Sequence, residues 1–320
     1  MTATEKALEL LGTGETVSGG RMARELWISR NAVWKVMNRL RQEGYGIEAA
    51  TKRGYRLLSA TDSISRMEIE RWLKTKTFAR EMEIHETLDS TNNRAKTLAA
   101  QGAAHGLLVA ADSQSGGRGR RGRNFFSPGA SGIYVSFILR PKVSPEQASL
   151  LTSLAAVAAA RAIETLAPAD VKIKWVNDLY LGGKKICGIL SEAGMDMETG
   201  GLDYAVVGIG VNVLPMEFPP ELSGIATSIG NETGKTVSRN RLIAEIANQL
   251  ENLYGDLETG NFLEESRRRS NVIGRKVQVF EGGRSYPAEA LGIDEKGKLI
   301  IRSPEGETHL GFGEVSLKLE

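Results

Sequence analysis

Hydrophobic residues recur at helical spacing near the start of the chain. Apolar positions three or four residues apart mark three segments: 3–11, 21–27 and 30–43. Ser18 and Ser29 precede the second and third segments, where a serine hydroxyl can accept a hydrogen bond from the first helical turn. Gly12 and Gly44 follow the first and third segments, as glycines that end helices do. We therefore expect three short helices here.

The third of these segments has one apolar face and one polar face. Val33, Met37 and Leu40 recur at helical spacing, so they should face a core. Two short strands, 47–50 and 55–58, follow around a basic turn, which is the pattern of a winged helix-turn-helix. A small helical module with a solvated basic face is the alternative; helix and wing together favour DNA binding. The residues expected to contact DNA are Ser29, Arg30, Asn31, Lys35, Asn38, Lys52 and Arg53.

Alternating and continuous apolar runs dominate the chain beyond residue 80. They predict strands at 81–88, 106–111, 132–139, 171–175 and 203–213. Gly182 and Gly183 separate two further alternating runs, as in a hairpin turn. Helices are expected after Ser90, which can cap one, from a capping box at 144–147 to residue 166, and over 242–257. From residue 274 the alternation predicts a small antiparallel β-barrel.

Charge is distributed unevenly along the 320 residues. Residues 1–60 carry ten Lys/Arg against six Asp/Glu, whereas residues 61–320 carry 31 against 33. The basic excess therefore lies in the N-terminal segment, as nucleic-acid binding requires. A segment at 59–65 has the composition of a linker, and the chain is long enough for two or three domains.

Several classes of protein are disfavoured by composition. Cys187 is the only cysteine, which excludes internal disulfides and multi-cysteine zinc sites, and its apolar strand setting favours packing over nucleophilic catalysis. The three histidines lie in unrelated segments, against a metal site or a serine hydrolase triad. Without a signal-like N-terminus or a long uncharged apolar run, we expect a cytoplasmic protein without a membrane segment. Segments 208–213 and 230–236 fall short of the dinucleotide and phosphate-loop motifs.

The segment 113–128, SQSGGRGRRGRNFFSP, joins two predicted buried strands and is far longer than a usual connection. Its glycines allow the backbone to approach a ligand closely, and its guanidinium groups can grip a phosphate or carboxylate in bidentate fashion. An RNA-binding arginine–glycine tract would have the same composition, so the loop by itself leaves both interpretations open. Lys184 and Lys185, on a later strand, point to opposite faces, so only one of them can enter a pocket.

Five motifs in order closely resemble those of biotin protein ligases: DSTN at 89–92, GRGRRGR at 117–123, KWVND at 174–178, KKICGIL at 184–190 and GIGVNV at 208–213. With the N-terminal and C-terminal patterns, the likeness covers essentially the whole chain and resembles the bifunctional type that also represses the biotin operon. It implies an α+β fold: a winged helix-turn-helix (1–60), a central mixed-sheet α/β ligase domain (61–272) similar to class II aminoacyl-tRNA synthetases, and an SH3-like barrel (273–320).

The resemblance implies a two-step reaction. Biotin and MgATP give biotinyl-5'-AMP and pyrophosphate, and a lysine of a biotin carboxyl carrier protein then takes the biotinyl group. It also implies a homodimer that binds operator DNA. The implied catalytic residues are Arg118, Arg120, Lys185 and Asp178. The implied biotin-binding residues are Ser90, Thr91, Asn92, Gln114, Gly117, Arg118, Gly119, Arg120, Lys185 and Gly188. The implied nucleotide-binding residues are Arg120, Arg121, Arg123, Phe125, Asn177, Asp178 and Asn212.

The sequence departs from the family at two places. Val176 replaces the proline of KWPND, and Phe125-Phe126 stands where tryptophan is frequent, so stacking on adenine is expected to differ. Two other functions stay open: a repressor that only senses biotin, and a lipoate or octanoyl transferase. The complete GRGRRGR with Lys185 argues against the first, and the absence of a histidine-containing motif argues against the second.

Overall fold

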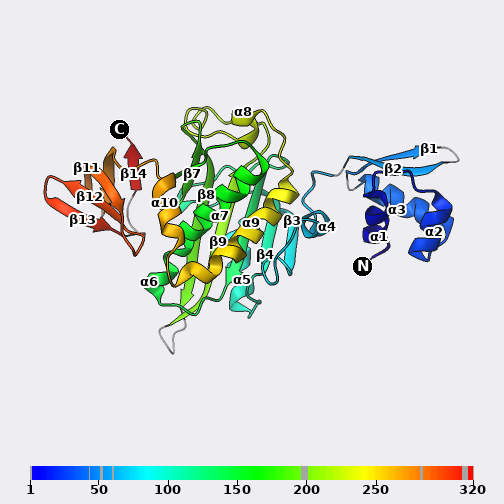
Figure 1. Ribbon diagram of the computed structural model, residues 1–320, viewed down its shortest axis with the longest axis horizontal. Coiled ribbons are helices and arrows are strands. Elements are labelled where there is room, and N and C mark those ends of the chain that lie inside the picture. The colour runs from blue at the N-terminus through cyan, green and yellow to red at the C-terminus, as the bar shows by residue number, and fades with distance from the viewer. Residues whose placement is uncertain are drawn as a thin grey trace. The chain divides into compact units, whose positions relative to one another are not determined.

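The computed structural model describes residues 2–42, 44–50, 53–59, 61–195, 201–281, 284–311 and 316–319. These residues form two compact units, Met1–Met67 and Glu68–Glu320 (Figure 1). The first unit contains the predicted helices and wing strands, and the second contains all the later elements. Lys52, one of the residues expected to contact DNA, lies outside the described residues.

The N-terminal unit has the predicted three helices and hairpin. In chain order they are α1 (Ala3–Leu11), α2 (Gly19–Leu26), α3 (Arg30–Gln42), β1 (Gly46–Ala50) and β2 (Gly54–Ser59), with the two strands antiparallel. The Ser18 hydroxyl accepts a hydrogen bond from the Arg21 N–H at 3.1 Å, and the Ser29 hydroxyl accepts from the Ala32 N–H at 3.1 Å. Both predicted caps are confirmed. A short helix, α4 (Arg66–Glu70), lies at the boundary of the two units.

A seven-stranded sheet forms the centre of the second unit. Its strands are β3 (Met82–Leu88), β4 (Leu108–Gln114), β5 (Gly132–Leu139), β6 (Lys172–Lys174), β7 (Asp178–Leu181), β8 (Lys184–Met195) and β9 (Leu202–Asn212). They lie in the order β3-β4-β5-β9-β8-β7-β6. Only β3 and β4 pair in parallel, so the sheet is mixed, as expected. Gly182 and Gly183 both adopt positive φ in the turn from β7 to β8, as predicted.

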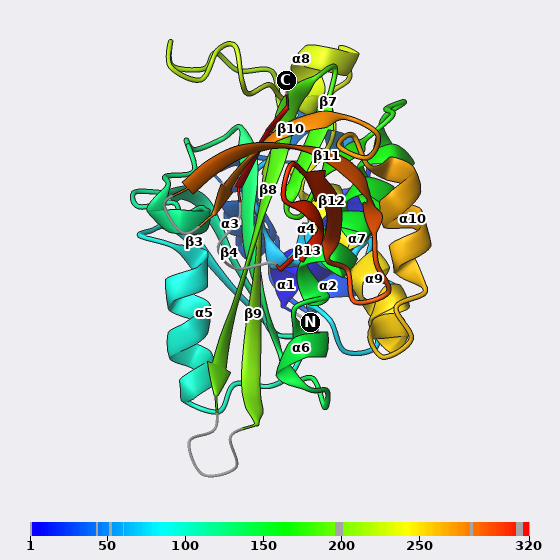
Figure 2. The same ribbon diagram turned by 90° about the vertical axis from the view of Figure 1, so that its left-hand side faces the viewer.

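Helices cover both faces of this sheet. They are α5 (Thr91–Ala100), α6 (Pro145–Ala148), α7 (Leu151–Leu166), α8 (Ile229–Thr233), α9 (Arg239–Tyr254) and α10 (Phe262–Arg269), with 3-10 turns η1 (Arg120–Gly122) and η2 (Gly255–Leu257). On β8, Glu192 bonds to Asn92 at the start of α5, whereas its neighbour Ser191 bonds to Thr152 of α7. Because adjacent strand residues face opposite ways, α5 and α7 cover opposite faces (Figure 2).

The prediction of a single helix from Ser144 to residue 166 is wrong in one respect, because the structure has two helices there. The capping box of Ser144 and Gln147 is present, but α6 ends after one turn. Ser149 and Leu150 then donate to the carbonyls three residues before them, which tightens the turn, and the Ser149 hydroxyl also bonds back to Glu146 O. The stretch Glu146–Leu166 is apolar enough to span a bilayer by composition, but 72% of its 18-residue window is buried in this unit, as in a core helix.

The C-terminal part of the second unit is an antiparallel sheet. Its strands are β10 (Lys276–Glu281), β11 (Arg284–Ile293), β12 (Leu299–Ser303), β13 (Gly306–Leu310) and β14 (Ser316–Leu319), in the order β13-β12-β11-β10-β14. Their inward side chains include Val277, Val279, Ala290 and Leu299, which are fully buried. The predicted alternation of short strands is therefore confirmed.

Charged side chains join α7 to α10 behind the central sheet. Arg269 donates to both carboxylate oxygens of Glu164, at 2.7 and 2.8 Å, and to Glu265 at 2.8 Å. Arg161 completes the network on Glu265 at 2.9 Å. Burial alone would raise the pKa of Glu265, but the hydrogen bonds from Arg161 and Arg269 outweigh it and hold this pKa below its ordinary value of 4.5. A carboxyl with a lowered pKa stabilises the fold above its unfolded pKa and loses that contribution as pH falls.

Replacing Arg269 with Met should destabilise the second unit by about 1.5 to 3 kcal/mol at pH 7, because both glutamates lose a charged hydrogen-bond donor. The matched control is Arg268→Met, since the Arg268 side chain is 76% exposed and lies 3.9 Å from Glu265. Thermal unfolding at pH 7 and pH 4 measures the effect. The Arg269→Met deficit should shrink at pH 4, and equal unfolding of the two variants at pH 7 would contradict the assignment.

Candidate functional site

Two adjoining cavities lie where the loop after β4 crosses β8 and β9. Arg118, Phe125, Gly188 and Leu190 line both of them. The first cavity is also lined by cationic and polar side chains from the loop, β6, β7 and β8: Arg120, Arg121, Arg123, Asn124, Lys174, Asn177, Asp178 and Lys185. The second is lined by Ser90, Thr91, Asn92, Gln114, Tyr134 and glycines of β9. The predicted loop and motifs thus meet at one place.

Glycines form the floor between the two cavities. Gly188 of β8 pairs with Gly210 of β9, and Gly208 follows on the same face. The Phe125 ring lies so close that a Cβ at Gly210 would be 2.6 Å from it, and a Cβ at Gly188 would be 3.1 Å from it. Side chains at these positions would clash with the ring, so glycine lets the flat Phe125 ring lie against the sheet here.

Polar side chains at one end of the floor are fixed by one another. Gln114 accepts from the Thr91 N–H at 2.9 Å and donates to the Ser127 hydroxyl at 3.0 Å. The Ser136 hydroxyl of β5 donates to the Asn92 side-chain oxygen at 2.7 Å and is hydrogen-bonded to the Thr91 hydroxyl at 2.8 Å. This end therefore offers both hydrogen-bond donors and acceptors in a rigid frame.

Ser90 differs from its predicted role. It occupies the N-cap position of α5 with extended backbone, but its hydroxyl makes no capping hydrogen bond to the described residues. In its place, Gln114 accepts from the N–H of Thr91, the first residue of the helix, and Ser90 is 1% exposed among the residues that line the cavity. Capping therefore does not explain this serine.

Positive charge concentrates at the other end of the site. Among the described residues that line the first cavity, six are Lys or Arg and only Asp178 is acidic. Lys185 Nζ lies 2.5 Å from Asp178 Oδ1, although that oxygen has no partner with hydrogen-bond geometry among the described residues. The short distance makes this an ion pair all the same, and Lys184 is not among the residues that line either cavity. Lys185 is thus the one of the two lysines that enters the site.

Burial disfavours the charged form of two of these cations. Desolvation lowers the pKa of Arg120 and of Lys174, and the nearby carboxylate of Asp178 only partly opposes it. Arg120 donates to the Asn177 side chain at 3.2 Å, and Asn177 in turn donates to Ile189 O at 3.0 Å. A cluster of cations that is partly desolvated and short of counter-charge favours an incoming anion.

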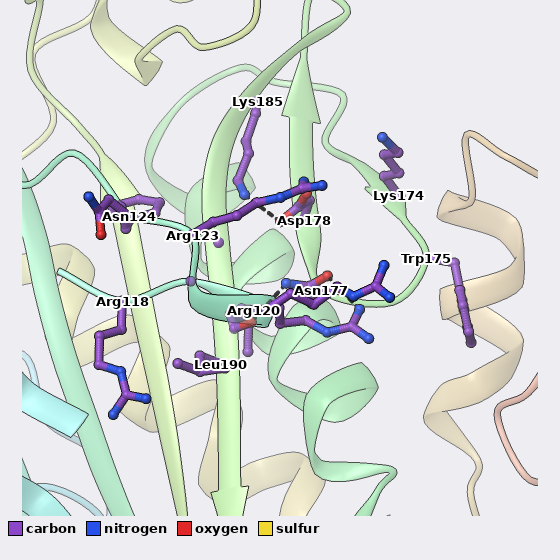
Figure 3. Close-up of a pocket in the computed structure, with 15 residues that line it drawn as sticks. Arg118, Arg120, Arg123, Asn124, Lys174, Trp175, Asn177, Asp178, Lys185 and Leu190 are labelled. Carbon is purple, nitrogen blue, oxygen red and sulfur yellow. Dashed lines mark hydrogen bonds and ion pairs between the residues drawn. The ribbon is translucent and has the colours of Figure 1, made fainter. Parts of the chain in front are cut away.

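Arg118 lies differently from the other loop arginines. Its guanidinium donates to Asn93 of α5 at 2.9 Å and lies 3.8 Å from Glu192 of β8. Figure 3 shows this side chain directed away from Lys185 and Asp178. Glu192 also binds Lys96 at 2.7 Å, so it anchors α5 and the loop together. Arg118 therefore holds the loop to α5 here, while the cationic end is formed by its neighbours.

Four other expected residues lie in different settings. Asn212 is buried, donates to Thr227 O at 3.0 Å and is not among the residues that line the two cavities. Arg121 has a left-handed backbone, with φ of 58°. At Gly117 a Cβ would lie 2.4 Å from Phe125 O, so the loop closes on itself there, and Gly119 lines the first cavity.

Trp175 is a site residue that the sequence did not single out. Its indole N–H donates to Gly297 O, in the turn before β12, at 3.0 Å, and it is 5% exposed. The C-terminal sheet thereby holds the segment that carries Asn177 and Asp178. Four further residues of the site were not predicted: Lys174, Ser127, Ser136 and Glu192. Lys174, like Trp175, belongs to the KWVND motif, whereas the other three belong to no sequence motif.

In the N-terminal unit, the residues expected to contact DNA are mostly exposed. Ser29, Arg30, Asn31, Lys35 and Arg53 lie at the surface. Asn38 is half-buried, and its side chain accepts from Arg41 at 3.0 Å. The buried face of α3 is Val33, Met37 and Leu40, as predicted.

Family models match three parts of the chain. Residues 84–212 match the Biotin/lipoate A/B protein ligase family, residues 4–56 match an HTH domain, and residues 272–318 match the Biotin protein ligase C terminal domain. The central match contains both cavities. The fold and site therefore define a ligase of the biotin and lipoate class joined to a helix-turn-helix.

Comparison with individual proteins identifies a narrower family within this class. The chain is 37% identical over 310 residues to the bifunctional ligase/repressor BirA of Bacillus subtilis (strain 168), covering 95% of this chain and 94% of that protein. BirA of Escherichia coli (strain K12) is 28% identical over 320 residues, with 99% and 98% covered. The biotin protein ligase from Aquifex aeolicus in complex with biotin and ATP superposes with a TM-score of 0.64 at 28% identity, covering 75% of this chain and all of that one. The chain belongs to the family of the bifunctional ligase/repressor BirA proteins.

Proposed function

We propose that this protein is a biotin protein ligase and a biotin-responsive repressor. It activates biotin with ATP to biotinyl-5'-AMP and transfers the biotinyl group to a lysine of biotin carboxyl carrier protein, in acetyl-CoA carboxylase or another biotin-dependent carboxylase. The same chain represses biotin synthesis genes. The observation that carries the ligase proposal is the joining of a glycine floor, on which the Phe125 ring lies, to a cavity that six cations and one carboxylate of the described residues line.

Biotin binds at the glycine floor. Its apolar rings lie over Gly188, and its ureido group meets the donors and acceptors of Ser90, Thr91, Asn92 and Gln114, which the network through Ser136 holds in place. The backbone at Gly117, Arg118, Gly119 and Arg120 closes over it, and its carboxylate points toward Lys185. The mutual fixing of these polar groups supports the assignment, because a preorganised site costs less to order on binding.

ATP occupies the cationic cavity. Its proposed contacts are Arg120, Arg121, Arg123, Phe125, Asn177, Asp178 and Asn212. Asn212 lines neither cavity, so this contact requires its side chain to leave Thr227. The residues that the structure describes contain no group of three His, Cys, Asp or Glu side chains that could hold a metal. Magnesium would come with the nucleotide phosphates, where it would neutralise part of their charge.

The first step brings two anions together. A carboxylate oxygen of biotin attacks the α-phosphorus of ATP, the bond to the β-phosphate oxygen breaks, and pyrophosphate leaves. Arg118, Arg120 and Lys185 screen the repulsion and stabilise charge on the transferring group, so catalysis consists of positioning and electrostatics. For Arg118 this requires its guanidinium to leave Asn93 and Glu192.

In the second step, the lysine amine of the carrier protein attacks the carbonyl carbon of the mixed anhydride, and AMP leaves. The amine must first lose a proton, and Asp178 orients it; this role is supported by Oδ1 of Asp178, which has an ion pair with Lys185 and no hydrogen-bond partner among the described residues. Nothing in the step needs a covalent nucleophile of the protein. Burial raises the pKa of Cys187 far above its ordinary value, which leaves that thiol inert.

The chain divides into three functional parts. Residues 1–60 form a winged helix-turn-helix, residues 61–272 a catalytic domain like class II aminoacyl-tRNA synthetases, and residues 273–320 an SH3-like barrel. The exposed basic residues of α3 bind operator DNA, and a homodimer places two such helices on a palindromic site. The protein acts in the cytoplasm, where its carrier protein and operator are found.

Two other functions predict different chemistry. A repressor that only senses biotin would bind both partners without releasing pyrophosphate. A lipoate or octanoyl transferase would share the central fold, since one family model covers biotin and lipoate proteins. The cationic cavity favours phosphate chemistry over sensing alone, and the relatives named as biotin ligases favour biotin over lipoate.

The proposed function is tested by exchange of labelled pyrophosphate into ATP. We expect label to enter ATP only when biotin and magnesium are present, with lipoate giving no exchange. Exchange with lipoate in place of biotin would establish the transferase alternative. Binding of biotin and DNA without exchange would establish a pure repressor.

Lys185→Ala should lower the exchange rate roughly 10- to 100-fold, because a charge-assisted contact to the reacting anions is lost. Lys184→Ala is the matched control and should change it less than about twofold, since Lys184 lines neither cavity. Circular dichroism checks that both variants fold. A larger loss in Lys184→Ala would show that the strand faces are assigned wrongly.

Trp175→Phe should raise the KM for ATP roughly two- to tenfold and leave biotin binding unchanged. The ring stays, but the hydrogen bond to Gly297 that positions Asn177 and Asp178 is lost. Trp72→Phe is the control, because Trp72 is 41% exposed and stacks on Arg241 away from the site. An unchanged KM for ATP, or an equal rise for both substrates, would contradict a positioning role for Trp175.

A further inference from the structure

Two tryptophans of the N-terminal unit lie at its surface. Trp27 is 90% exposed and Trp34 is 56% exposed, while Val33 and Met37 of α3 are buried. Indole is the largest side chain and normally gains stability from burial. Two exposed indoles on a unit of this size point to a surface that contacts a partner.

The backbone at Trp27 adds a second, independent observation. Trp27 ends α2 with φ of 55° and ψ of 40°, in the left-handed region, and its N–H closes the helix on Ala23 O and Arg24 O. Glycine adopts this conformation without strain, and helices usually end on glycine for that reason. A bulky side chain in a strained backbone conformation points to a function that depends on that side chain.

The two tryptophans flank the start of the helix expected to read DNA. Trp27 lies in the turn before α3. Trp34 lies at the edge of the polar face of α3, about 60° around the helix from the buried Met37 and next to Asn31 and Asn38. The Arg30 guanidinium, by contrast, lies back over Gly20 at the start of α2. An indole therefore borders the polar face of α3, beside polar and charged groups.

The charge around the tryptophans identifies the partner. Residues 19–42 carry six Lys/Arg and a single acidic residue, Glu25. Arg21, Arg24 and Lys35 are exposed on this surface. An apolar ring within a cationic face complements a polyanion that also presents apolar groups, and duplex DNA does so through its thymine methyl groups and its deoxyriboses.

We propose that Trp34 reads a thymine methyl group in the major groove and that Trp27 packs on the deoxyriboses of the flanking strand. This inference rests on the proposed repressor function and deepens it. The cationic neighbours supply affinity that does not depend on sequence, whereas Trp34 contributes sequence preference. The strained backbone at Trp27 is maintained because glycine there would remove the contact.

Full-length protein with biotin and ATP is used first to select duplexes from a random library, which yields a specific probe and a scrambled control of equal composition. Trp34→Ala should bind the specific duplex about tenfold more weakly and the scrambled duplex almost normally. Thymidine is then replaced by deoxyuridine at one position of the specific duplex at a time, which removes the thymine methyl group. At one position this replacement should weaken binding by the parent, and at the same position it should leave binding by Trp34→Ala unchanged. Lys35→Ala should instead weaken both duplexes and lower the salt dependence.

Trp27→Gly separates function from folding. It should raise the melting temperature of the N-terminal unit, because glycine relieves the left-handed strain, and should weaken binding to both duplexes about fivefold. Trp72→Phe in the second unit is the control and should bind like the parent.

Each failure has a separate meaning. A parent protein that selects no duplex would overturn the repressor function, and this inference with it. The inference alone would be overturned if the tryptophan variants bind the selected duplex as tightly as the parent does. It would also be overturned if replacing thymidine by deoxyuridine weakens binding by Trp34→Ala as much as binding by the parent. Weaker DNA binding accompanied by altered sedimentation would show that a second copy of the chain covers the tryptophans, which would also overturn it.

Discussion

The cationic cavity imposes the constraint on which the rest of the second unit depends. Six Lys and Arg side chains line it beside one carboxylate, so their mutual repulsion opposes closure of the loop. The fold meets this cost with fixed neutral partners: Asn177 holds Arg120, and its own amide is tied to the backbone of β8. The site is thus held ready for an anion by groups that do not cancel its charge.

The same constraint explains why the site joins two chemically different halves. A flat apolar group needs a floor without side chains, which the paired Gly188 and Gly210 provide at the centre of the sheet. Phosphate needs cations, which come from a loop and from the ends of β6 to β8. Glycine by itself favours disorder. The glycine floor is nevertheless rigid, because β9 is hydrogen-bonded between β5 and β8.

Much of this arrangement follows from sequence patterns, because the strands and helices obey local periodicity and the Gly182–Gly183 turn has the chemistry that hairpins require. Features that depend on tertiary contacts did not follow. The direction of Arg118 depends on Asn93 and Glu192, which are distant in sequence, and the role of Ser90 depends on Gln114 taking over the end of α5. The Trp175 contact crosses 122 residues and leaves no periodic signal.

The two units also divide the electrostatic work. In the first unit, cations lie at the surface in high dielectric, where they attract a polyanion from a distance and depend on salt. In the second, burial lowers the pKa of Arg120 and Lys174, so desolvated cations act at short range on a small anion. Long-range attraction between charges does not distinguish one DNA sequence from another, and buried charge by itself does not distinguish biotin from other carboxylates. In both units, we infer that discrimination comes from groups that contact the ligand at short range: side chains of the DNA-binding surface, with the indoles among them, and glycines with fixed amides in the other site.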